Sequence, residues 1–234
     1  MTESVFDSVT GPGESVWADM ALDVDDDAVT ERADSAAVDE QVRLLARANR
    51  LALVRDKATR HPDAHQGLDV VDVPLRCVAH AHPSCHFRWV HVTIDLSGTA
   101  GAKISDLVPR EKISDHPVKI TTTYHGGLSF STTHLPIKAD AAGTYTTEKD
   151  VYYPTVTSSG IDLTYAIWDF TARDGSPLHL DRQLRLLLTL PAAATAIGAE
   201  LSMRAVVEAD GVVGKIPLIG RRGASIRLDD VTEA

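Results

Sequence analysis

The sequence predicts an all-β protein: an antiparallel two-sheet β-sandwich, immunoglobulin-like or jelly-roll-like, preceded by a disordered acidic segment and one amphipathic α-helix. Three observations predict this class. After Gly67, apolar residues recur at every second position in many short segments, as in half-buried strands. Residues 35–60 contain neither Gly nor Pro. The first forty residues hold twelve acids and one base, a composition typical of disordered tails.

The composition is that of a globular chain. Its 234 residues are 44% hydrophobic and 24% charged, with two cysteines and a net charge of -10. No apolar run approaches the roughly 20 residues of a membrane-spanning helix, so no transmembrane segment is expected. The acidic N-terminus lacks the basic and apolar regions of a secretory signal, which predicts a cytoplasmic protein.

The negative charge is concentrated at the N-terminus. Residues 1–40 net -11, so the other 194 net +1, and this near-neutral remainder argues against nucleic-acid binding. We predict that residues 1–34 form a disordered arm. The arm is either a solubilising tail or a linear motif that binds a protein partner through Trp17, Met20 and Leu22.

Residues 35–60 have the pattern of an amphipathic helix. Ser35 is a plausible N-cap, acids lie in the early turns and bases in the last. Val38, Val42 and Leu45 begin an apolar stripe. The stripe either packs on the domain that follows or mediates self-association or docking to a partner protein.

Residues 61–67 contain Pro and Gly and are expected to be a linker, and residues 68–230 to be the β-sandwich domain. Within that domain the alternation is clearest around residues 90–96, 184–190 and 201–207. Nine strands with polar turns suit two antiparallel sheets. The expected strands are 70–78, 87–96, 118–124, 128–131, 148–157, 163–170, 180–190, 201–207 and 224–228.

The densest group of chemically versatile side chains is Cys77, His80, His82 and Cys85. Two thiolates and two imidazoles suit tetrahedral zinc if a hairpin folds between them, although the spacing is shorter than in zinc fingers. A cross-strand disulfide requires an oxidising compartment. We rank free thiols first, zinc second and a disulfide third, so no cofactor is expected except zinc.

Common catalytic motifs are missing. The nearest approach to a nucleophile elbow, residues 127–131, ends in Ser instead of Gly, and no dinucleotide-binding, phosphate-loop or zinc-protease motif occurs. These absences favour a protein without catalytic residues. Arg221 and Arg222, flanked by glycines, are candidates for a small anion-binding turn, against the commoner alternative of a solvated surface turn.

Three functions remain open. The leading hypothesis is a noncatalytic protein-interaction module that docks through the acidic arm and the helix. The second is a zinc-binding protein or metalloenzyme built on the cysteine and histidine cluster. The third is a membrane-acting β protein, suggested by the alternating stretches rich in Thr and Ser at 120–131 and 144–160, although such strands equally suit a sheet with one wet face.

Overall fold

The computed structural model describes residues 10–63, 67–113, 118–125, 144–151, 154–173, 176–227 and 232–233. The chain divides into two compact units. The first, which we call the sandwich unit, comprises Met1–Lys112 and Thr155–Ala234. The second, the hairpin unit, comprises Ile113–Pro154. Each unit is described by itself.

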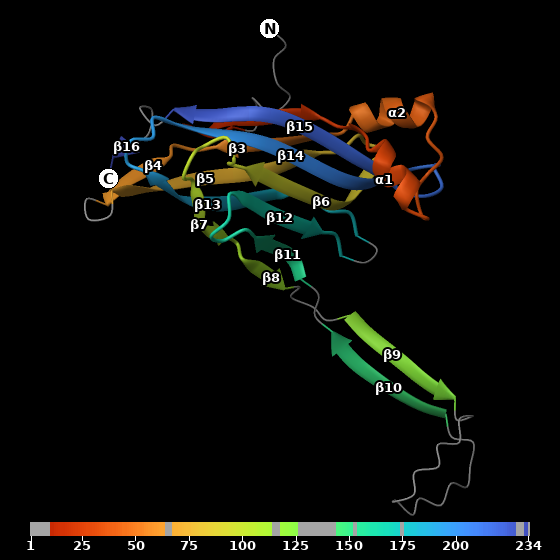
Figure 1. The fold of residues 1–234 in the computed structure, drawn as a ribbon. Helices are drawn as coiled ribbons and strands as arrows, with labels where there is room; N and C mark the ends of the chain where they lie inside the picture. Colours follow the sequence, from red (N-terminus) through yellow and green to blue (C-terminus); the bar gives the residue numbers. More distant parts are fainter. Residues whose placement is uncertain are drawn as a thin grey trace, which may run out of the picture. The chain divides into compact units, whose positions relative to one another are not determined.

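The first sheet of the sandwich unit has five strands on its main path, with two more at one side (Figure 1). In spatial order the main path is β1 (Ser15–Ala21), β3 (Arg50–Arg55), β5 (Leu68–His80), β13 (Asp181–Pro191) and β7 (Lys103–Val108). Strand β4 (Thr59–Asp63) pairs with β5, and β16 (Thr232–Glu233) pairs in parallel with β4. All other pairs in this sheet are antiparallel.

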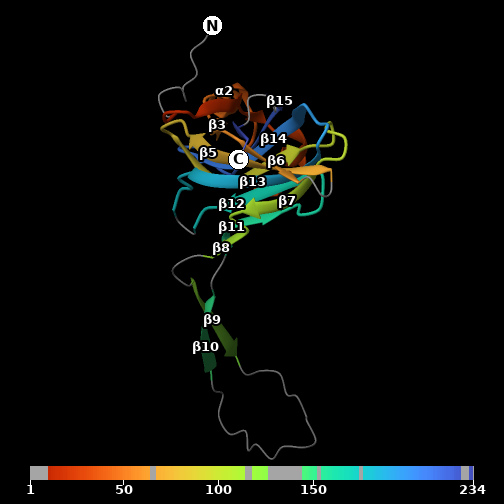
Figure 2. The ribbon, with the colours of Figure 1, turned by 90° about the vertical axis from the view of Figure 1, so that its left-hand side faces the viewer.

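The second sheet contains seven strands. Their spatial order is β2 (Asp23–Val24), β15 (Ile216–Arg227), β14 (Ala196–Ala209), β6 (Cys85–Asp95), β12 (Tyr165–Thr171), β11 (Pro154–Ser159) and β8 (Glu111–Ile113). Helices α1 (Asp26–Glu31) and α2 (Glu40–Arg47) lie at one end of the sandwich unit, and β4 and β16 lie at the other (Figure 1). Figure 2 views the unit from the end that carries β4 and β16.

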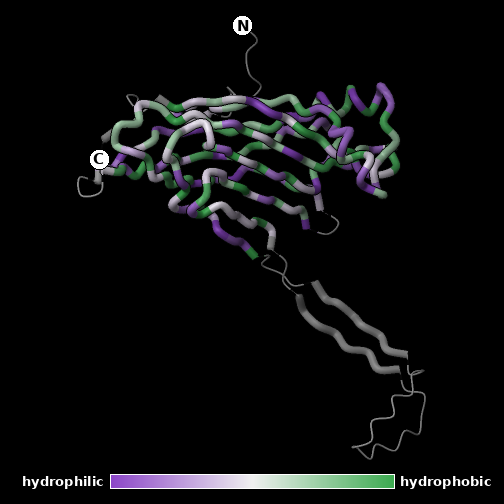
Figure 3. Tube along the Cα trace, viewed as in Figure 1, coloured by the Kyte–Doolittle hydropathy of each residue, from purple (hydrophilic) through white to green (hydrophobic). Residues whose placement is uncertain are grey.

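The two-residue alternation builds the core, as predicted. On β6, Val90, Val92 and Ile94 are fully buried, whereas the residues between them are half-exposed. Strands β13 and β14 alternate in the same way, and hydrophobic and hydrophilic segments alternate along the chain trace (Figure 3). Buried residues of both sheets belong to one cluster, which includes Trp168 and Phe87. The all-β two-sheet fold is therefore confirmed.

The prediction of a disordered arm over residues 1–34 is wrong from residue 15 onward, because β1, β2 and α1 belong to the sandwich unit. Acids of this segment form ion pairs with bases elsewhere in the unit, which compensates the repulsion among them. The pairs are Glu14–Arg76, Asp19–Arg50, Asp23–Arg47, Asp25–Arg204, Asp26–Arg43 and Asp34–Lys215. The Lys215 ammonium holds the pKa of Asp34 below its ordinary value.

The predicted helix over residues 35–60 is also wrong. Helix α2 has eight residues, and the chain then continues as strands β3 and β4. Four successive residues of β3, 51–54, are buried, so this strand has no polar face. A short apolar run of this kind fits a fully buried strand as well as a helix, and here tertiary packing decides.

Asn49 marks the end of the helix. Its side-chain amide is fully buried, donates to the Leu45 carbonyl at 2.7 Å and accepts from the His82 backbone N–H at 3.0 Å. Asn49 lies within residues 35–60, which the sequence predicted to form one helix. In the structure it joins α2 to the loop between β5 and β6.

Other boundaries differ as well. Residues 61–63 of the expected linker belong to β4, and residues 64–66 lie outside the described part. The expected strand 148–157 is divided between β10 (Thr144–Val151) and β11. The expected strand 128–131 lies outside the described residues, and β7 and β8 were not predicted.

Candidate functional site

The hairpin unit contains one regular antiparallel ladder. Strand β9 (Val118–His125) pairs with β10 over eight successive residue pairs, from Val118↔Val151 to His125↔Thr144. The register has no shift along this length. The segment between the strands, residues 126–143, lies outside the described part of the chain.

The register divides the residues of the ladder into two alternating sets, because successive strand positions fall on opposite faces. The apolar set comprises Val118, Ile120, Thr122 and Tyr124 with Val151, Lys149, Thr147 and Tyr145. The polar set comprises Lys119, Thr121, Thr123 and His125 with Asp150, Glu148, Thr146 and Thr144. All aliphatic and aromatic residues of the ladder thus fall in one set. Lys149 is the one charged residue within that set.

No helix in the described residues combines the length and the apolar character needed to cross a membrane.

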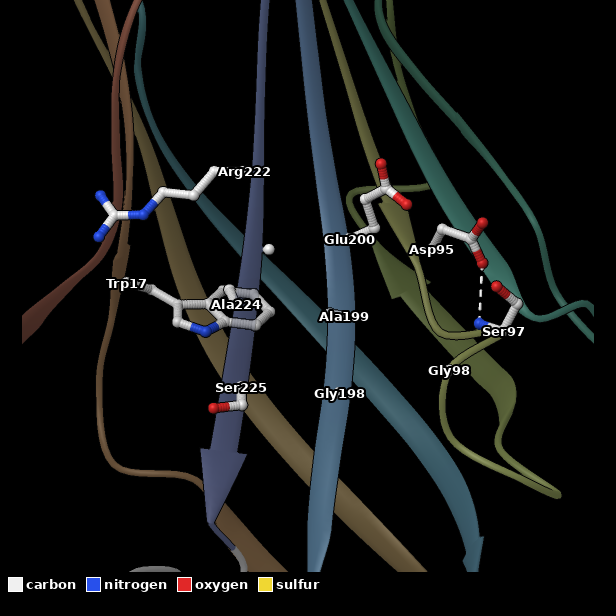
Figure 4. Close-up of a pocket in the computed structure, with 11 residues that line it drawn as sticks. Trp17, Asp95, Ser97, Gly98, Gly198, Ala199, Glu200, Arg222, Ala224 and Ser225 are labelled. Carbon is white, nitrogen blue, oxygen red and sulfur yellow. Dashed lines mark hydrogen bonds between the residues drawn. The ribbon is translucent and has the colours of Figure 1, made fainter.

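The sandwich unit carries a groove of about 740 Å³ on its second sheet. Figure 4 shows Trp17 and the Arg222 guanidinium on one side of strands β15 and β14, and the carboxylates of Glu200 and Asp95 on the other. Seven of the eleven lining residues are Gly, Ala or Ser. The groove therefore has little side-chain bulk along its middle and polar groups at both sides.

A hydrogen-bonded row lies elsewhere on the same sheet. His91 Nδ1 is 2.8 Å from Asp169 Oδ1, and its Nε2 is 3.1 Å from Thr93 Oγ1. Trp89, half-exposed, stacks on the His91 ring at 5.4 Å between ring centroids. Trp89 is therefore only partly buried, whereas Trp168 is fully buried in the core.

The proposed zinc ligands do not come together. Cys77 is on β5, in the first sheet, and Cys85 is on β6, in the second, because the chain crosses between sheets in the loop containing His82. Both cysteines are free and buried. Within the described residues no group of three or more His, Cys, Asp or Glu could hold a metal ion. The described residues therefore give no support to a zinc site with His80 as a ligand.

Burial also sets the reactivity of the two thiols. Removal from water disfavours the thiolate and raises the pKa of Cys77 to about 12, with a smaller contribution from Asp181. The pKa of Cys85 is raised in the same direction by burial. Neither thiol is poised for nucleophilic chemistry, since the thiolate is the reactive form.

The predicted partner-binding residues are part of the folded core or pack against it. Met20, Leu22 and Val42 are buried. Trp17, Val38 and Leu45 are partly buried and pack on the same cluster. They are consequently occupied by the protein's own core and do not form an exposed docking motif.

The predicted anion site is not a turn. Arg221 and Arg222 lie inside strand β15, opposite Ser202 and Leu201 of β14. Arg221 lines a charged hollow with Asp25 and Arg204, whereas Arg222 lines the groove near Trp17. The two arginines thus face different surroundings and do not form one cradle.

No family model matches the chain, and no curated protein does. Solved structures are similar to it at low identity. Clostridium perfringens delta-toxin shares 11% identity, with a TM-score of 0.41, over 95% of this chain and 97% of its own. Clostridium perfringens NetB toxin in the membrane-inserted form shares 10%, with a TM-score of 0.34, over 78% and 91%. A pore-forming protein shares 9%, with a TM-score of 0.35, over 88% and 89%.

The names of these neighbours bear on three predictions made from the sequence. By name, two are toxins, one of them in a membrane-inserted form, and the third is a pore-forming protein, whereas the sequence predicted a protein-interaction module. That module was to dock through a disordered arm and a helix over residues 35–60, and the structure contradicts both. The partner prediction relied on the same helix, which does not exist, because α2 ends at Arg47. The same names also disagree with the prediction of a cytoplasmic location.

Proposed function

We propose that this chain acts on membranes by inserting the β9–β10 hairpin into the bilayer. The observation that carries the proposal is the register of the hairpin, which collects the aliphatic and aromatic residues of both strands into one set. A strand that meets lipid on one face and water on the other needs this two-residue period. Among the similar structures is a toxin in membrane-inserted form, and we assign this chain the same kind of target.

The order of residues within the apolar set fits a bilayer. Val118 and Val151 form the pair at one end, and Tyr124 and Tyr145 form a pair six residues further along. Six residues of strand span about 20 Å. Tyrosine prefers the interface between lipid and water, so the tyrosine pair suits the far boundary of the apolar band.

Lys149 is the exception, and its place in the register accounts for it. It lies opposite Ile120, in the third pair from the Val118↔Val151 end. A lysine near a membrane boundary extends its aliphatic stem through the apolar layer and keeps its ammonium in water. The polar set contains an opposite-charge pair, Lys119↔Asp150, as expected for a face in contact with water.

A single hairpin leaves backbone N–H and C=O groups unpaired along both of its edges. In lipid each such group costs several kcal/mol, so an isolated hairpin is not a stable membrane structure. Hairpins from several copies of the chain, paired edge to edge, remove this cost. The proposal therefore includes self-association of the chain at the membrane.

Release of a trapped dye from lipid vesicles tests the proposal. We expect the full chain to release dye and Ile120→Asp to abolish release, because it places a carboxylate in the apolar set at a cost of up to about 2–4 kcal/mol per copy. In water this Asp lies opposite Lys149, a favourable pair, so lost release does not reflect a melted hairpin.

Thr123→Asp is the matched control, because it adds the same charge to the polar set, opposite Thr146. We expect it to retain release. Absence of release by the unmodified chain, or equal release by the two Asp variants, contradicts the proposal. Single cysteines at Thr122 and Thr123 labelled with a polarity-sensitive dye give a second reading, since both native cysteines are buried. On vesicles, only the label at position 122 should report an apolar environment.

A further inference from the structure

The groove beside Trp17 brings together an indole that packs partly on the core, a guanidinium and two carboxylates. Trp17 and Arg222 lie on one side of it, and Asp95 and Glu200 on the other (Figure 4). We propose that this groove binds a neutral or amino saccharide of about two rings. This inference goes beyond the proposed function and does not depend on it, because it concerns the sandwich unit alone.

The carboxylates of Asp95 and Glu200 are little used by the described part of the protein itself. Asp95 and Glu200 are directly opposite in the pairing of β6 with β14, and like charges at such positions are destabilising. Among the ion pairs of the described residues, neither carboxylate takes part. Asp95 accepts a hydrogen bond from the Ser97 backbone N–H at 2.8 Å, so at least three carboxylate oxygens remain as acceptors for donors from a ligand.

The opposite side of the groove supplies complementary chemistry. The Trp17 indole offers an apolar face on which the C–H groups of a sugar ring can stack. The Arg222 guanidinium donates to the Asp19 carbonyl at 3.4 Å and has further N–H groups for ligand hydroxyls. Hydroxyl groups both donate and accept, so a saccharide satisfies both sides.

The middle of the groove allows close approach to the backbone. Glu200 pairs with Gly223, and Gly198 pairs with Ser225, so small residues occupy both strands of the floor. Strands β15, β14 and β6 are neighbours, and crossing from the first to the third spans about 10 Å. This width exceeds one sugar ring and suits a disaccharide.

The groove is also fixed in shape before any ligand arrives. Thr99 Oγ1 accepts from the Gly198 N–H at 2.8 Å and donates to the Gly198 carbonyl at 2.9 Å. These two bonds hold the loop of Ser97 and Gly98 against β14. A site ordered in advance loses less entropy on binding.

The charge of the groove selects the class of saccharide. Two carboxylates and one guanidinium give a net of -1 among the lining residues. Sugars that carry carboxylates or sulfates are repelled, whereas neutral sugars are accepted. An amino group gains from the Asp95 and Glu200 carboxylates.

Titration of the full chain with lactose, N,N′-diacetylchitobiose, chitobiose and sialyllactose, followed by calorimetry and tryptophan fluorescence, tests the proposal. We expect saturable binding of at least one neutral or amino disaccharide with a Kd of about 1 mM, and weaker binding of sialyllactose. Glu200→Gln should weaken binding about tenfold, because one exposed charge-assisted acceptor is lost.

Trp17 packs partly on the core, so Trp17→Ala is read together with Trp17→Phe, which keeps an aromatic face. The first should weaken binding about tenfold or more, and the second should retain most of it. Arg221→Ala is the matched control for Arg222→Ala, since Arg221 is adjacent on β15 but outside the groove. Only the Arg222 variant should bind more weakly.

Three outcomes overturn the proposal: no binding of any of the four sugars at about 10 mM (tenfold above the expected Kd), tighter binding of sialyllactose than of lactose, or unchanged binding in Glu200→Gln and Trp17→Ala. The titrations contain no membrane. Their failure is therefore distinct from a failure of dye release, and either result can stand without the other.

Discussion

The strands of the sandwich unit and of the hairpin unit share a two-residue alternation of apolar and polar residues, but the two units differ in what this alternation provides. In β6 and β14 the alternate residues are buried in a core shared by two sheets. In β9 and β10 the period is equally regular, but six of the sixteen residues are Thr and only three are aliphatic. A two-stranded hairpin of this composition is at most marginally stable by itself in water.

This difference separates stability from the proposed activity. The sandwich unit contains the large buried side chains and the ion pairs of the acidic segment, so it determines whether the chain is folded. The hairpin supplies an amphipathic ladder, and in the proposed function its apolar set contacts lipid. Substitutions in the two units should therefore affect different measurements, and three predictions test this.

The largest effect is expected in the core. Trp168 on β12 is fully buried, so Trp168→Ala should lower the free energy of unfolding by about 3–5 kcal/mol in urea titrations followed by near-ultraviolet circular dichroism. The Trp168 indole N–H is buried without a hydrogen-bond partner among the described residues. Trp168→Phe keeps most of the ring volume and removes this N–H, so it should cost much less.

If alanine and phenylalanine at this position cost the same, ring volume does not determine stability here, and the assignment of the core to the sandwich unit fails. Dye release by Trp168→Phe should match that of the unmodified chain. A core variant that remains folded yet loses release would show that the two units do not divide their roles in this way.

A second effect, expected to be no larger, concerns alkaline pH. The buried Cys77 has a pKa raised to about 12, whereas the unfolded thiol titrates near the ordinary value of 9.0. Burial therefore favours the neutral thiol, and its contribution to stability is fully present below pH 9 and is lost as pH rises toward 12. Over this window the free energy of unfolding should fall by about 1.4 kcal/mol per pH unit from this group alone.

The measurement compares the unmodified chain with Cys77→Ala at each pH, because other groups titrate in the same range and cancel in the difference. The variant should be less stable at pH 8 and should lose stability less steeply above pH 9. Parallel slopes for the two proteins would mean that Cys77 is not buried as the structure places it.

The sequence predicted the architecture well where strands are long and have one wet face. Val90, Val92 and Ile94 alternate with polar residues, and their burial follows directly from that pattern. The pattern failed in β3, where Leu51, Ala52, Leu53 and Val54 are all buried and no period exists to identify a strand. The local helix preference of these residues therefore led to a predicted helix that is too long. In the structure, pairing within the sheet makes the segment a strand.

The prediction of a disordered arm over residues 1–34 was wrong for a different reason. Counting charges gives the net charge of the segment but does not show which bases compensate it. The acids pair with bases that only the fold brings near, and the pairs are Asp19–Arg50, Asp25–Arg204 and Asp34–Lys215. The groove was missed likewise, since Trp17, Asp95 and Glu200 come from three distant parts of the chain. The hairpin was partly found, because its alternation is local and needs no tertiary information.

The smallest expected effect is the sharpest test of the comparison. Ile120→Asp and Thr123→Asp both lie in the hairpin unit, so each should change the free energy of unfolding of the sandwich unit by less than about 0.5 kcal/mol, as surface substitutions do. Near-ultraviolet circular dichroism, which reports on packed aromatic side chains such as Trp168, is the suitable probe. A loss of more than about 1 kcal/mol in Ile120→Asp alone would mean that Ile120 contributes to a packed core in the soluble chain. In that case the apolar set would have a structural use in water, and its alternation would no longer point to a membrane.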